Sequence, residues 1–277
     1  MINNMEIKAR GLTFDVYEGG PADGDPVLLL HGFPQDHREF DPILPRLHAA
    51  GLRTYALDQR GYSSGARPDA VSAYRITEPL ADAVAVLDAL DIESAHVIGH
   101  DWGAQIGWLL AATHPARVRT LTAISVPHPK ALQLALRVRP TQRARFAYTL
   151  LFRSPIAERT LLAGGGAVLK GMLRPIGDRA RLYVDAMRTD PARLTGGLNW
   201  YRALSGADLG GARVITVPTT YIWPDHDPVV GRTAALRTRD WVEADFQLVV
   251  LRGVSHWAPE QAPESVADCA LARIRPA

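Results

Sequence analysis

Strand-like and helix-like hydrophobic patterns alternate along the first half of this chain. Residues 12–17 alternate apolar and polar side chains, which predicts an edge strand of a hairpin. Residues 27–30 form a continuous apolar run, typical of a strand buried on both faces. Further strands are expected at 54–57, 95–98 and 118–126, and helices at 39–50, 77–90 and 103–114, with Thr77 as a candidate helix cap. This alternation predicts a parallel sheet flanked by helices.

The pattern changes after the Pro-His-Pro sequence at 127–129. From residue 130 to about 213 the sequence has no strand-like run, and helical spacing, arginines and three consecutive glycines dominate. Strands are expected again at 217–223 and 247–251, and helices at 232–242 and 263–273. We therefore expect an α/β core, residues 1–127 and 214–277, with an inserted helical cap, residues 128–213.

Composition limits the classes of protein that remain. The chain has 277 residues, 47% hydrophobic and 22% charged, which suits one large α/β domain with a proper core. The single cysteine excludes an intrachain disulfide and a thiolate metal cluster. No apolar run is long enough to span a bilayer, and residues 1–10 lack the apolar core of a signal peptide, so we expect a cytoplasmic protein.

Charge is unevenly distributed although the net charge is only +2. Residues 128–213 contain 15 Lys or Arg against 5 Asp or Glu. A solvated outer face of the cap is the favoured interpretation, while attraction of an anionic substrate stays open. No nucleic-acid-binding motif accompanies the basic residues, so no nucleic-acid partner is expected.

Polar residues follow several of the predicted strands at their carboxyl ends. In an open α/β sheet this edge carries the ligand site, so side chains from distant parts of the sequence are expected to meet there. The candidates are His31, Asp58, Asp101, Asp225, Asp227 and His256.

The sequence GHDWG at 99–103 has the spacing of a nucleophile elbow, in which two glycines leave room for a sharp strand-to-helix turn. The residue at its apex is Asp101. A carboxylate with a pKa of about 3.9 is ionised at neutral pH, and it can attack a saturated, polarised carbon to form an ester. The alternative is an ordinary turn in which Asp101 caps the helix.

Such an ester must be hydrolysed, and His256 in GVSHW at 253–257 is the candidate base for water. Either Asp225 or Asp227 can orient its imidazole. The N–H groups of Trp102 and of Phe33, in HGFP at 31–34, are the candidate donors to the oxyanion. Nothing else supplies convergent metal ligands, so neither a metal nor a cofactor is expected.

These motifs, together with DQRGY at 58–62 and the Asp-x-Asp-Pro sequence at 225–228, resemble the α/β-hydrolase superfamily and within it the soluble epoxide hydrolases. The resemblance covers nearly the whole chain. It implies the α/β-hydrolase fold, Asp227 as the partner of His256, and Asp225 as part of the loop structure. Pro224 departs from the pattern, because relatives commonly carry glycine there.

The resemblance also implies two cap tyrosines that protonate the epoxide oxygen. NWYR at 199–202 nominates Tyr201, and FAY at 146–148, followed by Phe152 and Pro155, nominates Tyr148. Tyr183 resembles a position used for packing. A phenol with a pKa of about 10 is a weak but usable acid toward an alkoxide.

The expected function is hydrolysis of an epoxide to a vicinal diol, with a small-molecule epoxide and water as partners and a homodimer left open. Two alternatives remain: a haloalkane dehalogenase, although Phe33 lacks the side-chain donor usual there, and a ligand-binding protein on the same fold. A fluoroacetate dehalogenase would carry Arg in place of Trp102. The expected substrate contacts are His31, Pro34, Phe146, Phe152 and Trp200.

Overall fold

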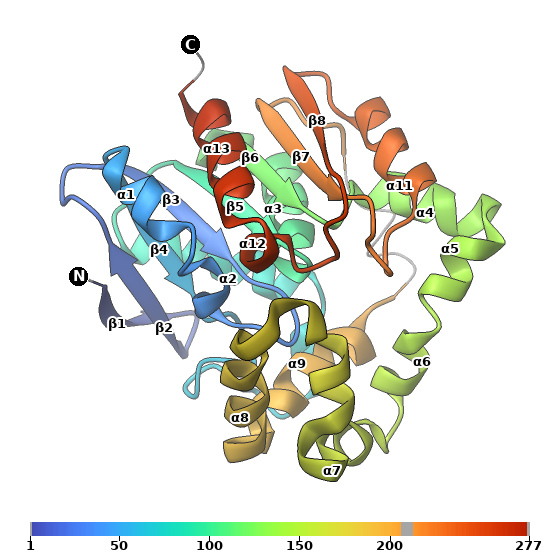
Figure 1. Ribbon diagram of the computed structural model, residues 1–277. Coiled ribbons are helices and arrows are strands. Elements are labelled where there is room, and N and C mark those ends of the chain that lie inside the picture. The colour runs from blue at the N-terminus through green and yellow to red at the C-terminus, as the bar shows by residue number, and fades with distance from the viewer. Residues whose placement is uncertain (1, 206–212, 276–277) are drawn as a thin grey trace.

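One eight-stranded sheet forms the centre of the protein, for which a computed structural model describes residues 2–205 and 213–275 (Figure 1). The strand order is β1-β2-β4-β3-β5-β6-β7-β8, and only the β1–β2 and β2–β4 pairs are antiparallel. The strands are β1 (Asn3–Ala9), β2 (Leu12–Gly19), β3 (Asp25–Leu30), β4 (Leu52–Leu57), β5 (Ala95–His100), β6 (Val118–Ile124), β7 (Thr219–Pro224) and β8 (Phe246–Leu251). The predicted α/β fold with a mostly parallel sheet is confirmed.

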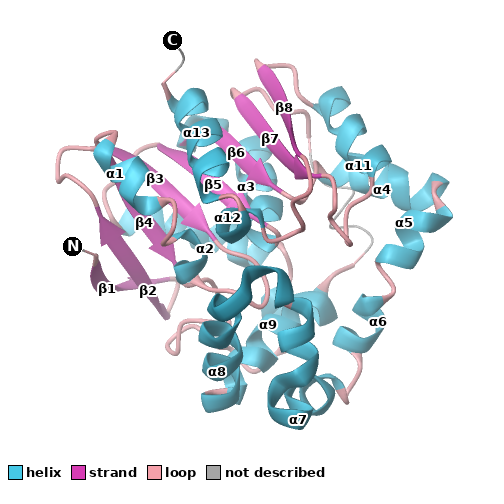
Figure 2. Ribbon diagram, in the orientation of Figure 1, coloured by secondary structure: helices cyan, strands magenta, loops and turns pink. Residues whose placement is uncertain are grey.

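Helices cover both faces of this sheet (Figure 2). Apolar residues of α1 (Leu44–Ala49), α12 (Ala258–Gln261) and α13 (Pro263–Ile274) pack on one face. Those of α2 (Thr77–Ala89), α3 (Trp102–Thr113) and α11 (Arg232–Arg237) pack on the other. Because both faces are covered, the central strands are buried on both sides, which explains their continuous apolar runs. Short 3-10 helices lie at His37–Phe40, Val71–Tyr74, Pro115–Arg117 and Thr238–Trp241.

Helices alone occupy the chain between β6 and residue 203. They are α4 (Pro129–Val138), α5 (Pro140–Arg145), α6 (Tyr148–Arg153), α7 (Ala157–Met172), a 3-10 segment (Arg174–Arg179), α8 (Ala180–Thr189) and α9 (Pro191–Ala203). Helices α6 to α9 form a separate apolar cluster. This cluster also includes three buried residues of the core, Phe33, Tyr62 and Trp257. Helix α4 instead buries Leu132 and Ala135 in the cluster of α2, α3 and α11. The first helix of the predicted cap therefore packs on the core.

The N-terminal edge of the sheet differs from the prediction. The strand expected at residues 12–17 is β2, but it lies inside the sheet between β1 and β4, so it is not the edge. The edge is β1, which the sequence analysis missed. Met5 and Ile7 alternate with polar residues in β1 and are only half-buried, because one side of an edge strand has no neighbour.

Two helix predictions also need correction. The helix expected at 39–50 is a 3-10 turn at His37–Phe40 followed by α1, because Pro42 lies between them and cannot donate a backbone hydrogen bond. Thr77 is the first residue of α2 rather than its cap, and the preceding residue makes no side-chain capping bond. Within residues 2–205 and 213–275, no helix has the length and hydrophobicity needed to cross a membrane.

Candidate active site

Asp101 sits on a strained turn between β5 and α3. Its backbone angles, φ 51° and ψ −116°, lie outside the regions that residues with a Cβ normally adopt. A Cβ at Gly99 would collide with the backbone of Gly103, and one at Gly103 would collide with the carbonyl of Leu30. The two glycines therefore allow strand and helix to approach closely, as the elbow motif predicts.

The carboxylate of Asp101 is held by groups from two other loops. The backbone N–H of Phe33 donates to Oδ1 at 2.9 Å, and Nε2 of His256 lies 3.3 Å from Oδ2. Burial alone would raise the pKa of Asp101, but the hydrogen bond and charge of His256 outweigh it and hold the pKa below its usual value. Asp101 is therefore ionised at neutral pH.

His256 is bound on its other side by Asp227, with Nδ1 and Oδ2 2.8 Å apart. The second oxygen of Asp227 accepts hydrogen bonds from the N–H groups of Val229 at 2.6 Å and Val230 at 3.1 Å. Asp225 faces elsewhere and accepts a bond from the N–H of Gly253 at 2.7 Å. Of the two carboxylates that the sequence left open, Asp227 is the one beside the imidazole.

The two carboxylates control the charge of His256. Burial disfavours the imidazolium, but Asp227 and Asp101 stabilise it more strongly and raise the pKa of His256 to about 10. The imidazolium thus persists while Asp101 is ionised. A reaction that consumes the charge of Asp101 lowers the pKa of His256 and favours the neutral imidazole, which is the form that can accept a proton from water.

Behind His256 lies a buried pair that the sequence analysis missed. Nε2 of His100 donates to the backbone carbonyl of His256 at 2.9 Å, and its Nδ1 lies 3.0 Å from Oε2 of Glu39. Burial and the neighbouring His256 lower the pKa of His100 to about 4, and burial raises the pKa of Glu39 well above its usual value. The pair is therefore neutral, with the Glu39 carboxyl donating to His100. The feature of the sequence that could have drawn attention to His100 is its position directly before Asp101.

A cavity of about 200 Å³ opens in front of Asp101. Its other walls come from the loop after β6, from α3, α4, α6 and α9, and from the loop after Asp227. The lining is mainly apolar and consists of Asp101, Trp102, Gln105, Val126, Leu132, Leu136, Phe146, Tyr148, Thr149, Arg153, Tyr201, Leu204, Ser205 and Val229. The cavity can accept a small hydrophobic molecule and present it to the carboxylate.

Tyr148 and Tyr201 both line this cavity, with ring centroids 6.1 Å apart. Tyr201 also packs edge-on against the indole of Trp102, at 5.1 Å between centroids. Desolvation in the cavity, with the charge of Asp101 nearby, raises the pKa of both phenols above the usual value. Both hydroxyls therefore keep their protons across the physiological pH range and can donate them to a bound oxygen.

The two residues predicted as oxyanion donors both lie beside Asp101. Phe33 already donates its N–H to the Asp101 carboxylate. Helix α3 begins at Trp102, so its N–H is one of the first-turn amides for which a helix offers no carbonyl partner.

The predicted substrate contacts divide into two groups. Phe146 lines the cavity, but the described cavity wall does not include His31, Pro34, Phe152 or Trp200. Each of these four is buried, and three of them have other contacts, so we do not propose them as substrate contacts. His31 accepts from the N–H of Gln59, and Trp200 donates to the carbonyl of Arg60. Phe152 packs edge-on against Tyr201, and Pro34 is buried.

Several residues that line the cavity were not predicted from the sequence. Leu132 and Leu136, one helical turn apart on α4, supply apolar wall, and Gln105 lies one turn after Asp101 on α3. Their spacing shows only that they share a helix face. Which residues face the cavity depends on how α4 and α6 dock on the core.

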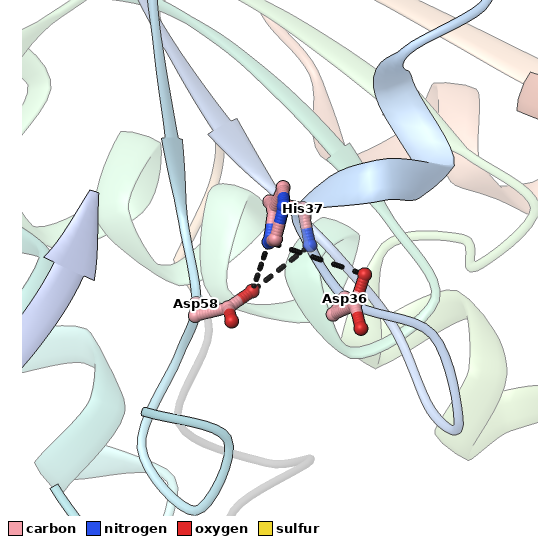
Figure 3. A group of neighbouring side chains, drawn as sticks. All are labelled: Asp36, His37 and Asp58. Atoms are coloured by element: carbon pink, nitrogen blue, oxygen red, sulfur yellow. Dashed lines mark hydrogen bonds and ion pairs between the residues drawn. The ribbon is translucent and has the colours of Figure 1, made fainter. Parts of the chain in front are cut away.

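Among the described residues, one group of side chains has a spacing that could hold a metal ion: Asp36, His37 and Asp58 (Figure 3). His37 Nδ1 lies 2.9 Å from Asp58 Oδ1. Arg193 lies 2.8 Å from Asp58, and Arg38 lies 2.6 Å from Asp36. Because guanidinium groups already neutralise both carboxylates, we propose no metal at this group.

Comparison with known proteins identifies relatives of this chain. A family model described as the alpha/beta hydrolase fold matches residues 25–263. Epoxide hydrolase A of Mycobacterium tuberculosis is 33% identical, over 96% of this chain and 95% of the relative. An AB hydrolase superfamily protein of Bacillus subtilis, YfhM, is 32% identical over 97% of this chain and 96% of its own length.

Solved structures of epoxide hydrolases are also similar to this chain. The crystal structure of epoxide hydrolase A from Mycobacterium thermoresistibile superposes with a TM-score of 0.86 at 27% identity, covering 100% of this chain and 99% of that one. Epoxide hydrolase VrEH1 from Vigna radiata has a TM-score of 0.84 at 27% identity, covering 99% and 98%.

Proposed function

Because the chain belongs to the α/β-hydrolase family, in its epoxide hydrolase branch, we propose that it converts an epoxide to a vicinal diol through a covalent ester on Asp101. The observation that carries this proposal is the arrangement around the cavity. An ionised carboxylate and two protonated phenols, Tyr148 and Tyr201, line the same small space, and His256 contacts that carboxylate from behind.

In the first step an oxygen of Asp101 attacks one carbon of the epoxide ring. A carbon–oxygen bond of the ring breaks, and the released alkoxide takes a proton from Tyr148 or Tyr201. The product is a hydroxyalkyl ester of Asp101 and a tyrosinate. The tyrosines matter because an unprotonated alkoxide is a poor leaving group. That both residues line the cavity supports this role.

In the second step water attacks the carbonyl carbon of the ester. The charge of Asp101 is gone, so His256 is free to lose its proton. This proton converts the tyrosinate back to the neutral tyrosine. The neutral imidazole, oriented by Asp227, then takes a proton from the attacking water. The N–H groups of Phe33 and Trp102 would hold the negative oxygen of the tetrahedral intermediate. Collapse releases the diol, its oxygen taking the remaining proton of the former water, and regenerates ionised Asp101 and the imidazolium.

Turnover in water labelled with oxygen-18 tests this route. Over repeated turnovers the label is expected to enter the side chain of Asp101, detected by mass spectrometry of the peptide that contains it. A single turnover with unlabelled enzyme should leave the diol without label. Label in the diol of that first turnover, with none in Asp101, would mean that water attacks the epoxide directly, and this would overturn the ester mechanism.

The same assays decide between this function and its alternatives. Release of halide from chloroalkanes or bromoalkanes faster than diol from epoxides would favour a haloalkane dehalogenase. Binding of epoxides without any diol would favour a ligand-binding protein. We also propose residues 128–213 as a cap, a cytoplasmic location and a homodimer; gel filtration with light scattering tests the last.

A further inference from the structure

We propose that Gln142 and Arg145 of α5 are positioning residues that fix the acid loop, residues 227–231, and thereby set the rate of ester hydrolysis. This inference rests on the proposed function. It adds that the inserted helices not only supply the phenols but also hold the Asp227–His256 pair in place.

Three backbone groups of the acid loop are bound by these two side chains. The amide nitrogen of Gln142 donates to the carbonyl of Val229 at 2.7 Å, and its amide oxygen accepts from the N–H of Gly231 at 2.9 Å. Arg145 donates to the carbonyl of Asp227 at 2.6 Å. Two side chains one helical turn apart thus hold both ends and the middle of the loop.

The loop in turn fixes the carboxylate of Asp227. One carboxylate oxygen accepts from the N–H groups of Val229 and Val230, which leaves the other for His256. A rotation of the loop backbone would carry these two N–H groups with it. The orientation of Asp227, and through it that of His256, therefore depends on the contacts made by Gln142 and Arg145.

Helix α5 has little else to hold it against the core. Within its six residues, Gln142 is the buried one, and the helix buries no large apolar side chain. Figure 1 shows α5 at the periphery of the molecule, beyond α4. The polar bonds to the acid loop therefore attach α5 to the core, while Arg143 binds it to α4. Loss of the bonds from Gln142 and Arg145 would leave the acid loop without this support.

The chain immediately after α5 carries two cavity residues, Phe146 and Tyr148. Val229 of the acid loop lines the same cavity. A short stretch of backbone therefore connects Tyr148, a proton donor in the first step, to the side chains that anchor the loop of Asp227, the acid used in the second step. Because Asp101 attacks without help from Asp227, loss of the anchor should slow hydrolysis more than alkylation.

The test measures the two steps separately in Gln142→Ala and Arg145→Ala. Rapid mixing with a styrene-type epoxide, followed by acid quench and intact-protein mass spectrometry, gives the rates of ester formation and ester decay. We expect ester decay to slow by about 10- to 100-fold, as for other small displacements of catalytic groups, with ester formation changed by less than about threefold. Arg145→Lys, which keeps a donor for the Asp227 carbonyl, should recover part of the decay rate.

Arg143→Ala is the matched control, because Arg143 is on the same helix but bonds only to the carbonyls of Leu136 and Arg137. It should behave like the wild type. Proton NMR adds a direct readout: the Nδ1 proton of His256 should give a strong downfield signal in the wild type, and this signal should weaken in Gln142→Ala.

Two results would overturn the inference. One is an equal loss of both steps, which would indicate general damage to the fold; the other is no change in ester decay. Failure of the proposed function looks different, because the wild type itself would then form no ester on Asp101.

Discussion

Nε2 of His256 lies 3.3 Å from Oδ2 of Asp101, so the proposed base of the second step directly contacts the proposed nucleophile of the first. Each group stabilises the charged form of the other. The pKa of His256 is raised to about 10 and the pKa of Asp101 is lowered. Alkylation of Asp101 removes one member of this pair, which makes the protonation state of His256 depend on the stage of the reaction.

The first prediction concerns this coupling. In Asp101→Asn the negative charge beside the imidazolium is lost, while burial still disfavours that cation, so the pKa of His256 should fall from about 10. NMR titration of the His256 ring protons measures the change. Asp225→Asn is the control, because the Asp225 carboxylate binds Gly253 and not His256. It should leave the titration midpoint of His256 unchanged. An unchanged midpoint in Asp101→Asn would contradict the coupling.

Removal of the base should trap the intermediate. In His256→Gln the epoxide ring can still open, but no group accepts a proton from water, so the ester should accumulate to one equivalent. Intact-protein mass spectrometry should show an added mass equal to that of the epoxide. His114, an exposed histidine after α3, provides the control His114→Gln, which should turn over normally. Full diol production by His256→Gln would exclude His256 as the base.

The two phenols are predicted to act on ring opening. Tyr148→Phe and Tyr201→Phe should each lower the rate of ester formation by about 10²-fold, the lower range for general acid catalysis, and the double variant should lower it further. Decay of an ester already formed should change much less. Tyr183→Phe is a suitable control, because its hydroxyl donates to Glu260 rather than to the cavity. A normal rate of ester formation in the double variant would show that the two phenols do not protonate the epoxide oxygen.

The apolar wall predicts a size limit for the substrate. Leu136 lines the cavity of about 200 Å³, and Leu136→Trp should fill part of it. We expect kcat/KM for polycyclic epoxides to fall by about tenfold or more, whereas that for a small aliphatic epoxide stays within a few-fold. Diol formation on a panel of epoxides measures this ratio. Equal losses for large and small epoxides would place Leu136 outside the substrate path.

A buried ion pair is predicted to stabilise the fold close to the inserted helices. Both oxygens of Asp82 accept from Arg60, at 2.6 Å each, and the carbonyl of Arg60 accepts from the indole of Trp200. Asp82→Ala leaves a buried guanidinium without its main partner, which should lower the free energy of unfolding by about 3 kcal/mol. Urea denaturation measures it. Asp88→Ala, which removes an exposed carboxylate from α2, should cost about 0.5 kcal/mol or less.

The sequence was sufficient where the physical cause is local. Buried strands read as apolar runs, so β3 and β5 could be found within a few residues, and the glycines beside Asp101 marked the elbow because only they allow the close approach seen there. The order of the motifs placed His256 and the acid at one sheet edge, since parallel strands end together. The edge strand β1 was not predicted, because its half-exposed residues give only a weak alternation of apolar and polar side chains.

The tertiary structure decided everything that depends on contacts between distant segments. Trp200 and Phe152 are aromatic cap residues in the sequence, yet the fold uses them for packing and gives the cavity wall to Leu136 and Val229 instead. The sequence does not show that His100 pairs with Glu39, because 61 positions separate them. Hydrophobic periodicity fixes which face of an element is buried, but only the docking of the elements determines what each face meets.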